Sequence, residues 1–289
     1  MDKIKVALIG VGGRGEGLYR VSLRFRKDID IIAVCDIREQ RIDYTVKEIV
    51  ADGHPEPARY TDYIKCLDEA HPEAIVIATD WMPHLEISTA AMERGIAVAC
   101  EVGGAYNLDS LWEFIRVYER TKTPIMFLEN CCYGRMELLA LKMKRLGLLG
   151  KIVHCEGGYR HCLLDIADAW ERRQYFRIEE YIHRNCESYP THEIGPIAKL
   201  LDINCGNRFV SLTAMGSGAF GLNEYSKKRG YEDLANIRYN QSDIVTTILK
   251  CYNGETVTIT LDTTLPRYYS RGFAVHGTKG MICEENQSV

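Results

Sequence analysis

The chain has 289 residues, of which 46% are hydrophobic and 26% charged, and this length suggests about two domains at roughly 150 residues each. Its 36 basic and 40 acidic side chains give a net charge of −4, and no lysine and arginine stripe stands out, which disfavours nucleic-acid binding. The longest apolar runs, such as Ala74–Ala78 and Ile96–Cys100, fall far short of the roughly 18 residues that a membrane helix needs, so we expect a soluble protein without a membrane partner.

The first 130 residues or so alternate apolar runs with helical stretches, which is typical of βαβ units and a parallel sheet buried on both faces. In the helix expected at Asp109–Lys122, Asp109 caps the start, and Leu111, Phe114, Ile115 and Tyr118 recur at helical spacing. The pattern predicts an α/β domain with a doubly wound parallel sheet. Its strands are expected at Ile4–Ile9, Ile29–Cys35, Ala74–Thr79, Ile96–Cys100 and Pro124–Leu128.

The pattern changes after a linking helix expected at Gly134–Leu146. Longer alternating strands follow at Thr246–Tyr252 and Thr256–Thr263, joined by the turn Asn253-Gly254. A second hairpin is indicated by Gly277-Thr-Lys-Gly280. These features predict an open, mostly antiparallel sheet within an α+β domain.

We therefore expect a cofactor-binding domain at 1–129 and a substrate-binding domain at 130–289. An open sheet suggests that another subunit covers its exposed face, because large uncovered apolar surfaces are rare on monomers. The expected partner is thus a second copy of the chain, in a homo-oligomer.

The chain contains 11 cysteines, an odd number, without CxxC spacing. Cysteines on buried-looking strands are typical of reduced thiols, and no signal peptide fits before the first strand, so we expect a cytoplasmic protein. The adjacent Cys131 and Cys132 suit either a redox pair or a soft metal site, but they lack partner ligands at suitable spacing. Packing is the favoured interpretation, and no metal is expected.

A G-x-G-x-x-G motif follows the first strand and opens a helix. In such loops the first glycine permits the tight turn, the second lets the backbone approach a pyrophosphate, and the third lets the helix pack closely on the strand. The alternative is a glycine-rich turn that binds no ligand, but the position of the motif between a strand and a helix favours a cofactor-binding loop. The residues assigned to it are Gly10, Gly12, Gly13, Arg14 and Gly15.

The second strand ends in Asp36, 21 residues beyond Gly15, where an acid accepts the ribose hydroxyls of NAD and repels a 2′-phosphate. NAD is therefore favoured over NADP. Arg38 and Arg41 lie close enough to weaken that preference, and we include Arg38 in the cofactor site.

Two further strands end in polar or aromatic residues, at the sheet edge where open α/β sheets bind ligands. Thr79, Trp81 and His84 follow one of these strands and Glu101 follows the next, so we expect all four at the cofactor. For His84, the alternative is an ordinary surface residue at a helix start.

Four motifs occur in order along the chain: Glu129-Asn130-Cys131-Cys132-Tyr133, Glu156-Gly-Gly-Tyr159-Arg-His161, Arg184-Asn185 with Tyr189-Pro-Thr-His192, and Pro266-Arg267-Tyr-Tyr269-Ser-Arg271. Together with the glycine-rich loop they resemble glycoside hydrolase family 109 within the Gfo/Idh/MocA oxidoreductases. The resemblance spans essentially the whole chain and implies a Rossmann domain, an open-faced sheet domain and NAD-dependent α-N-acetylgalactosaminidase activity. Related chains continue well beyond Lys279-Gly280, which raises the expectation of a shortened second domain.

By that resemblance, Tyr159 would remove the sugar C2 proton, as a phenol whose pKa is lowered by the positive charge of Arg160 or Arg177. His192 would take the C3 hydroxyl proton. The alternative interpretation of Tyr159 is an aromatic residue on one face of a strand. The alternative for His192 is a structural residue.

The resemblance also implies that the sugar is held by Glu129, Arg177, Tyr189 and Tyr269, and that Asn130 lies close to the nicotinamide. Alternatively, 189–192 is simply a turn into a helix expected at 197–203.

In that helix Pro196 would suit the first turn. His161 and His183 match no part of the family pattern used here and are expected to be surface or packing residues.

The implied reaction is redox-neutral: oxidation at C3 acidifies C2–H, the C1 substituent leaves, water adds and hydride returns to C3. The alternative is a sugar dehydrogenase that forms a 3-ketosugar and releases NADH. Related dehydrogenases commonly carry Lys-Pro where this chain has Val102-Gly103, and an Asp where Ser188 stands four residues before His192, which counts against that alternative. A non-catalytic NAD-binding or oligomerising protein is the third hypothesis.

Overall fold

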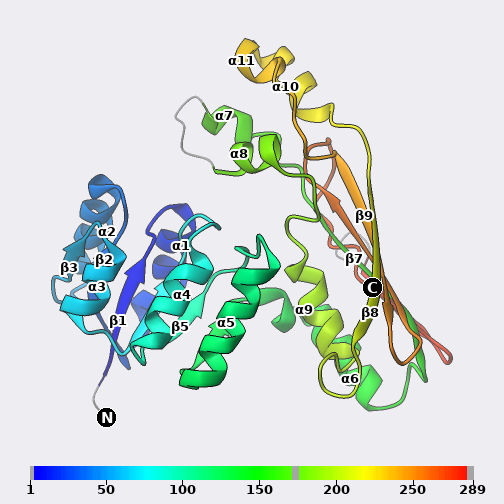
Figure 1. Cartoon of the computed structure of the whole chain (residues 1–289), viewed down its shortest axis with the longest axis horizontal. Helices are drawn as coiled ribbons and strands as arrows, with labels where there is room; N and C mark the ends of the chain where they lie inside the picture. The colour runs from blue at the N-terminus through cyan, green and yellow to red at the C-terminus, as the bar shows by residue number, and fades with distance from the viewer. Residues whose placement is uncertain (1–2, 171–175, 285–289) are drawn as a thin grey trace. The chain divides into compact units, whose positions relative to one another are not determined.

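The computed structural model describes residues 3–170 and 176–284 and divides the chain into two compact units, Met1–Leu128 and Glu129–Val289 (Figure 1). Sequence reasoning places the boundary one residue later. Among the described residues, no helix combines the length and the hydrophobicity needed to cross a membrane.

The first unit contains a six-stranded sheet in the order β3-β2-β1-β4-β5-β6, in which every pairing is parallel. The five predicted strands are confirmed to within two residues at every end. The strands are β1 (Ile4–Ile9), β2 (Ile29–Cys35), β3 (Ala58–Tyr60), β4 (Ala74–Ile77), β5 (Ala97–Cys100) and β6 (Ile125–Phe127). Sequence reasoning missed β3, because three residues after Pro55 and Pro57 are too few to show an alternating pattern.

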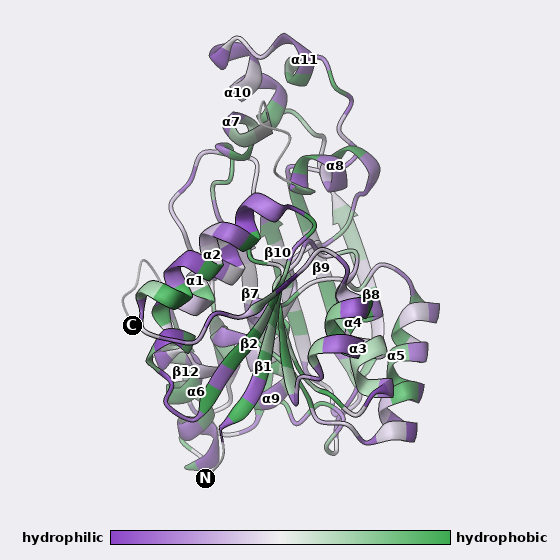
Figure 2. Ribbon diagram, turned by 90° about the vertical axis from the view of Figure 1, so that its left-hand side faces the viewer, coloured by the Kyte–Doolittle hydropathy of each residue, from purple (hydrophilic) through white to green (hydrophobic). Residues whose placement is uncertain are grey.

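Helices cover both faces of this sheet, as the doubly wound prediction requires. Tyr19 and Ile42 pack with Val6 on one face, while Leu67 and Phe114 pack with the strands on the other. The helices are α1 (Gly13–Val21), η1 (Leu23–Phe25), α2 (Glu39–Ala51), α3 (Tyr63–Ala70), α4 (His84–Glu93) and α5 (Leu108–Thr121). Figure 2 shows α1 and α2 on one side of the sheet and α3, α4 and α5 on the other.

The start of α5 corrects one prediction. Asn107, rather than Asp109, caps the helix, because its side chain accepts a hydrogen bond from the backbone N–H of Ser110 at 2.8 Å. Asp109 lies in the first turn, where its charge favours the helix dipole. Ile115 and Tyr118, expected on the buried face, are about two-fifths exposed.

The second unit contains a six-stranded sheet in the order β12-β11-β7-β10-β9-β8. Only the β7–β10 pairing is parallel, so the mostly antiparallel prediction is confirmed, as are both predicted hairpins. The strands are β7 (Ile152–Arg160), β8 (Phe209–Gly216), β9 (Ile244–Cys251), β10 (Thr256–Asp262), β11 (Ala274–Gly277) and β12 (Met281–Cys283).

Helices cover one face of this sheet. Residues of α6 and α9 pack with Cys155 and Ile259 at one end, and residues of α7, α8, α10 and α11 pack with Tyr159 and Leu261 at the other. The helices are η2 (Asn130–Tyr133), α6 (Arg135–Arg145), α7 (Ile166–Trp170), α8 (Phe176–His183), α9 (Thr191–Leu200), α10 (Gly221–Arg229) and α11 (Glu232–Ala235).

Within residues 3–170 and 176–284, the other face is open, and on β9 and β10 it is mainly polar. Thr246, Thr256, Thr258 and Thr260 alternate with the buried residues, and Ile248 is the main exception. The open face of these two strands is therefore less apolar than expected, whereas Met215 on the neighbouring strand β8 is 76% exposed. Self-association through this face stays a prediction.

Helix α9 begins at Thr191, six residues before the start expected at Ile197. Pro196 lies inside the helix, and because it has no N–H it leaves the carbonyl of His192 without its usual helical donor. Pro190 stands just before the first turn of α9, where Pro196 was expected to stand. Both prolines suit a helix start, and the sequence pattern does not distinguish them.

Candidate active site

The glycine-rich loop has the geometry that its spacing predicts. Gly10 has a φ of +84°, which only glycine adopts readily, and it makes the tight turn after β1. A Cβ on Gly15 would lie 2.0 Å from the carbonyl oxygen of Gly10, so close helix packing requires glycine there. Gly12 is the N-cap of α1 without a side-chain cap, which leaves the first amide groups of α1 for an anion.

Asp36 lies beside this loop and is buried. Its carboxylate accepts hydrogen bonds from the backbone N–H of Val11 at 2.9 Å and of Arg38 at 3.0 Å. A guanidinium nitrogen of Arg41 is 3.9 Å away. An acid is thus fixed next to the loop, as the spacing predicts.

Two residues expected at the cofactor join the glycine-rich loop to the end of β5. Arg14 donates to Glu101 at 2.6 Å, and Glu101 is buried. This ion pair holds the first turn of α1 against the strand end. Cofactor contact by either side chain stays a prediction.

The residues after β4 are buried more deeply than expected. His84 is 1% exposed, so the surface interpretation is wrong, and its Nε2 lies 3.1 Å from the carbonyl oxygen of Thr79. Burial lowers the pKa of His84 and favours its neutral form. Trp81 packs on Gly103, where a Cβ would lie 2.4 Å from the indole ring. Trp81 and His84 therefore hold the ends of β4 and β5 together.

The second unit brings its predicted catalytic and sugar-binding residues into one cluster. Tyr159, at the end of β7, has its ring 4.5 Å from that of Tyr189 and 5.6 Å from that of His192. The Arg177 guanidinium lies 5.9 Å from the Tyr159 ring centroid and 5.0 Å from that of Tyr189. Arg160 points to the opposite face of the strand, because neighbouring strand residues alternate. Arg177 is therefore the cation beside Tyr159.

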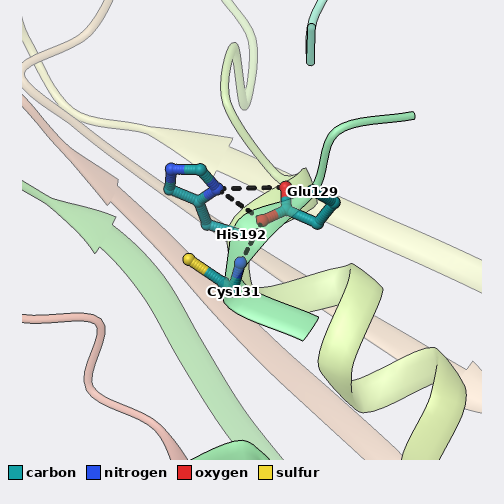
Figure 3. A group of neighbouring side chains, drawn as sticks. All are labelled: Glu129, Cys131 and His192. Carbon is teal, nitrogen blue, oxygen red and sulfur yellow. Dashed lines mark hydrogen bonds and ion pairs between the residues drawn. The ribbon is translucent and has the colours of Figure 1, made fainter. Parts of the chain in front are cut away.

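Glu129 contacts His192, although the resemblance assigned it to the sugar. The Nδ1 of His192 lies 2.8 and 3.0 Å from the two carboxylate oxygens, and the Cys131 N–H donates to the same carboxylate at 2.9 Å (Figure 3). Burial alone raises the pKa of Glu129, but these hydrogen bonds outweigh it and hold that pKa below its ordinary value. An ionised Glu129 carries no proton, so Nδ1 is the donor, and neutral His192 keeps Nε2 as an acceptor.

His161 is a site residue that sequence reasoning missed. Its Nδ1 lies 3.1 Å from the Tyr159 hydroxyl, and its ring is 5.1 Å from that of Tyr269. Burial and the charge of Arg177 lower the pKa of His161, which favours a neutral ring whose Nδ1 can accept a hydrogen bond from the Tyr159 hydroxyl. Residues two apart on a strand share a face, which is the signal that could have found it. His183, by contrast, is exposed as expected and lies 3.5 Å from Glu179.

A cavity of about 380 Å³ adjoins this cluster within the second unit. Asn130 and Tyr269 line it, together with Arg271, which pairs with Glu137 at 2.6 Å. Asn130, expected at the nicotinamide, thus faces this cavity, and its cofactor contact stays a prediction.

Substitution of Glu187 by glutamine is expected to change how stability depends on pH. Burial raises the pKa of Glu187 to about 8, against a smaller opposite influence of the backbone amides of Tyr189 and Leu261. The folded state therefore keeps a proton that the unfolded chain releases above about pH 4.5, so stability falls between about pH 4.5 and 8, by at most roughly 1.4 kcal/mol per pH unit from this group.

Glutamine has no such proton, so urea unfolding across this range should show a shallower decline for E187Q. The exposed Glu179→Gln is the control, and parallel curves for E187Q and the unchanged chain would contradict the assignment.

Comparison with protein families divides the chain as the structure does. Residues 4–126 match the oxidoreductase family with an NAD-binding Rossmann fold, and residues 133–289 match the C-terminal domain of glycosyl hydrolase 109. A glycosyl hydrolase family 109 protein of Stenotrophomonas maltophilia is 35% identical, with 99% of this chain and 69% of the relative aligned. An alpha-N-acetylgalactosaminidase of Tannerella forsythia is also 35% identical, over 99% of this chain and 66% of the relative. The chain thus spans about two thirds of these relatives' length.

Solved structures confirm the fold. The scyllo-inositol dehydrogenase of Lactobacillus casei, with bound NAD(H) and scyllo-inositol, superposes with a TM-score of 0.76 over 98% of this chain and 76% of its own. Its sequence is 14% identical, so this likeness shows the fold alone.

Proposed function

Because this chain belongs to glycosyl hydrolase family 109, we propose that it cleaves α-N-acetylgalactosaminides or closely related glycosides by a redox-neutral, NAD-dependent route. The chain is an enzyme of a glycosidase family with an oxidoreductase-type, nucleotide-binding fold. Since it spans about two thirds of its relatives, the reaction and the substrate are proposals for this chain.

The residues of the first unit fit a dinucleotide. Gly10 and Gly15 are positions that a Cβ would block, and the α1 amides suit a pyrophosphate. Asp36, fixed beside the loop, suits the ribose hydroxyls of NAD and disfavours a 2′-phosphate. When bound, NAD would supply reversible hydride transfer at sugar C3, which makes the C2 proton acidic.

The second unit supplies the acid–base groups. His192 accepts the C3 hydroxyl proton at Nε2, with Glu129 holding Nδ1. Tyr159 removes the C2 proton, with Arg177 favouring the phenolate and His161 placed to accept the tyrosine proton. Arg177, Tyr189 and Tyr269 are assigned to the sugar hydroxyls, as the resemblance implies.

One observation supports this proposal above the others: Tyr159 and His192 lie side by side, and each has its own hydrogen-bonding partner, His161 and Glu129 respectively. Two separate proton acceptors are what consecutive proton removals at C3–OH and C2–H require. A net dehydrogenase needs only the acceptor for the C3 hydroxyl proton. Dehydrogenase activity is therefore the second candidate function.

We place the reaction in the cytoplasm, because all 11 cysteines are free thiols and reduced cysteines are typical of that compartment. The substrate on this proposal is a small glycoside.

The experiment records nitrophenol release from p-nitrophenyl α-N-acetylgalactosaminide together with NADH absorbance, with and without added NAD. We expect nitrophenol without net NADH. NADH accumulation without nitrophenol would establish the dehydrogenase instead. No change in either signal across a panel of N-acetylhexosaminides would contradict the glycosidase proposal for this chain.

A further inference from the structure

Three side chains of metal-ligand type meet beside the proposed acid–base groups. One carboxylate oxygen of Glu129, the Sγ of Cys131 and a ring nitrogen of His192 all lie within 4.8 Å of one another (Figure 3). Glu129 and Cys131 belong to the turn that forms η2, and His192 lies in the first turn of α9. Cys131 is 3% exposed, so its thiol is held in this position by packing.

This donor set matches one class of cation. Zn²⁺ binds cysteine sulfur, histidine nitrogen and carboxylate oxygen at about 2.0–2.3 Å, and three protein ligands leave a fourth position for water. Ligands at those distances from one ion lie roughly 3.3–3.8 Å apart. The Cys131 thiol therefore needs to approach by at most about 1 Å, and the Glu129 and His192 ligand atoms, now 2.8–3.0 Å apart, need to separate slightly. Hard cations such as Mg²⁺ prefer oxygen ligands and do not suit the thiol.

The surrounding charges permit a dication here. The Arg271 guanidinium is hydrogen-bonded to the Cys131 thiol, and its positive charge is balanced by Glu137 at 2.6 Å and by Glu284 at 3.4 Å. Cys131 also lines the cavity of about 380 Å³.

We propose that Glu129, Cys131 and His192 form a binding site for Zn²⁺ or a similarly soft divalent cation, and that occupancy of this site switches the enzyme off. The Cys131 S–H bond breaks as the metal–sulfur bond forms, and its proton goes to solvent. The His192 proton moves from Nδ1 to Nε2, because the ion takes the Nδ1 lone pair. No oxidation state changes.

Inhibition follows from the change in the tautomer of His192. With its proton on Nε2, His192 has no lone pair left to accept the C3 hydroxyl proton. This consequence rests on the proposed function, whereas metal binding does not.

The binding test uses Co²⁺ as a Zn²⁺ substitute on the full chain, in a thiol-free reductant. We expect a cobalt–thiolate charge-transfer band that Cys131→Ser abolishes and that the neighbouring Cys132→Ser retains. Titration with Zn²⁺ should displace the Co²⁺. Loss of a residue that only hydrogen-bonds to a metal ligand typically lowers metal affinity by about 10–100-fold. Loss of Cys131, which is itself a ligand on this proposal, should therefore weaken Zn²⁺ binding by more than roughly 100-fold. A band of equal strength in C131S, or no band in the unchanged chain, overturns the proposal.

The activity test compares Zn²⁺ inhibition of glycoside cleavage in the same three proteins. The unchanged chain and C132S should be inhibited and recover on addition of EDTA, while C131S, measured relative to its own rate without metal, should resist Zn²⁺. Equal inhibition of C131S overturns the switch. If the cobalt band depends on Cys131 while no glycoside is cleaved, the metal site stands and the proposed function fails.

Discussion

Replacement of Tyr159 by phenylalanine is expected to lower kcat for glycoside cleavage by roughly 10²–10⁴-fold, the contribution typical of a positioned general base. The substitution removes only the hydroxyl that lies 3.1 Å from His161. The ring keeps its packing against Tyr189, so the fold and NAD binding should be unchanged. Steady-state kinetics measure the loss, and thermal unfolding checks the fold.

The matched control is Tyr252→Phe, because Tyr252 is an exposed tyrosine of the same unit, outside the cluster. Deuterium exchange at sugar C2 adds a specific readout, since it requires proton removal and should disappear in Y159F. An unchanged kcat with continued C2 exchange in Y159F would show that another group removes this proton.

The second large effect is expected for Glu129→Gln. A carboxylate holds the proton of His192 on Nδ1, whereas the amide of glutamine is able to donate to Nδ1 and so favour the proton on Nε2. The comparable Asp-to-Asn change in serine proteases costs about 10⁴ in kcat through the wrong tautomer. We expect a loss of roughly 10²–10⁴-fold here, mainly in kcat.

The control for this change is Glu179→Gln, a glutamate that faces the exposed His183 elsewhere in the unit. Stability gives an independent readout of the same pair. The lowered pKa of Glu129 stabilises the fold above its ordinary pKa of about 4.5, and this contribution is lost as pH falls through the folded value. E129Q should therefore be less stable than the unchanged chain at neutral pH and approach it in acid. A kcat equal to that of E179Q would remove Glu129 from the mechanism.

Most strands of the first sheet and the β9–β10 hairpin of the second could be predicted because they carry a run or an alternation of apolar residues, whereas no bounds were predicted for β7 or β8. β3 has three residues on a sheet edge, and its local pattern carries no such signal. The start of α9 could not be predicted because Pro190 and Pro196 both suit a helix start, and the local sequence does not distinguish between them.

The sequence predicted which residues belong to the site better than it predicted which of them contact one another. Tyr159 and His192 came from the resemblance, and His161 could have been found because it lies two residues after Tyr159, just beyond the end of β7. The Glu129–His192 contact joins residues 63 positions apart in two different turns. No local pattern encodes this contact, so the sequence did not predict it, and the assignment of Glu129 to the sugar stays a prediction.

The parallel pairing of β7 with β10 has a consequence for folding kinetics. His154 and Thr256, partners in this pairing, are 102 residues apart, so a long stretch of chain must be ordered before the two strands can join. Loop-closure entropy makes such pairings slow to form. Tyr159 lies on β7 opposite Leu261, so refolding experiments should see this tyrosine become protected only after the β9–β10 hairpin has formed.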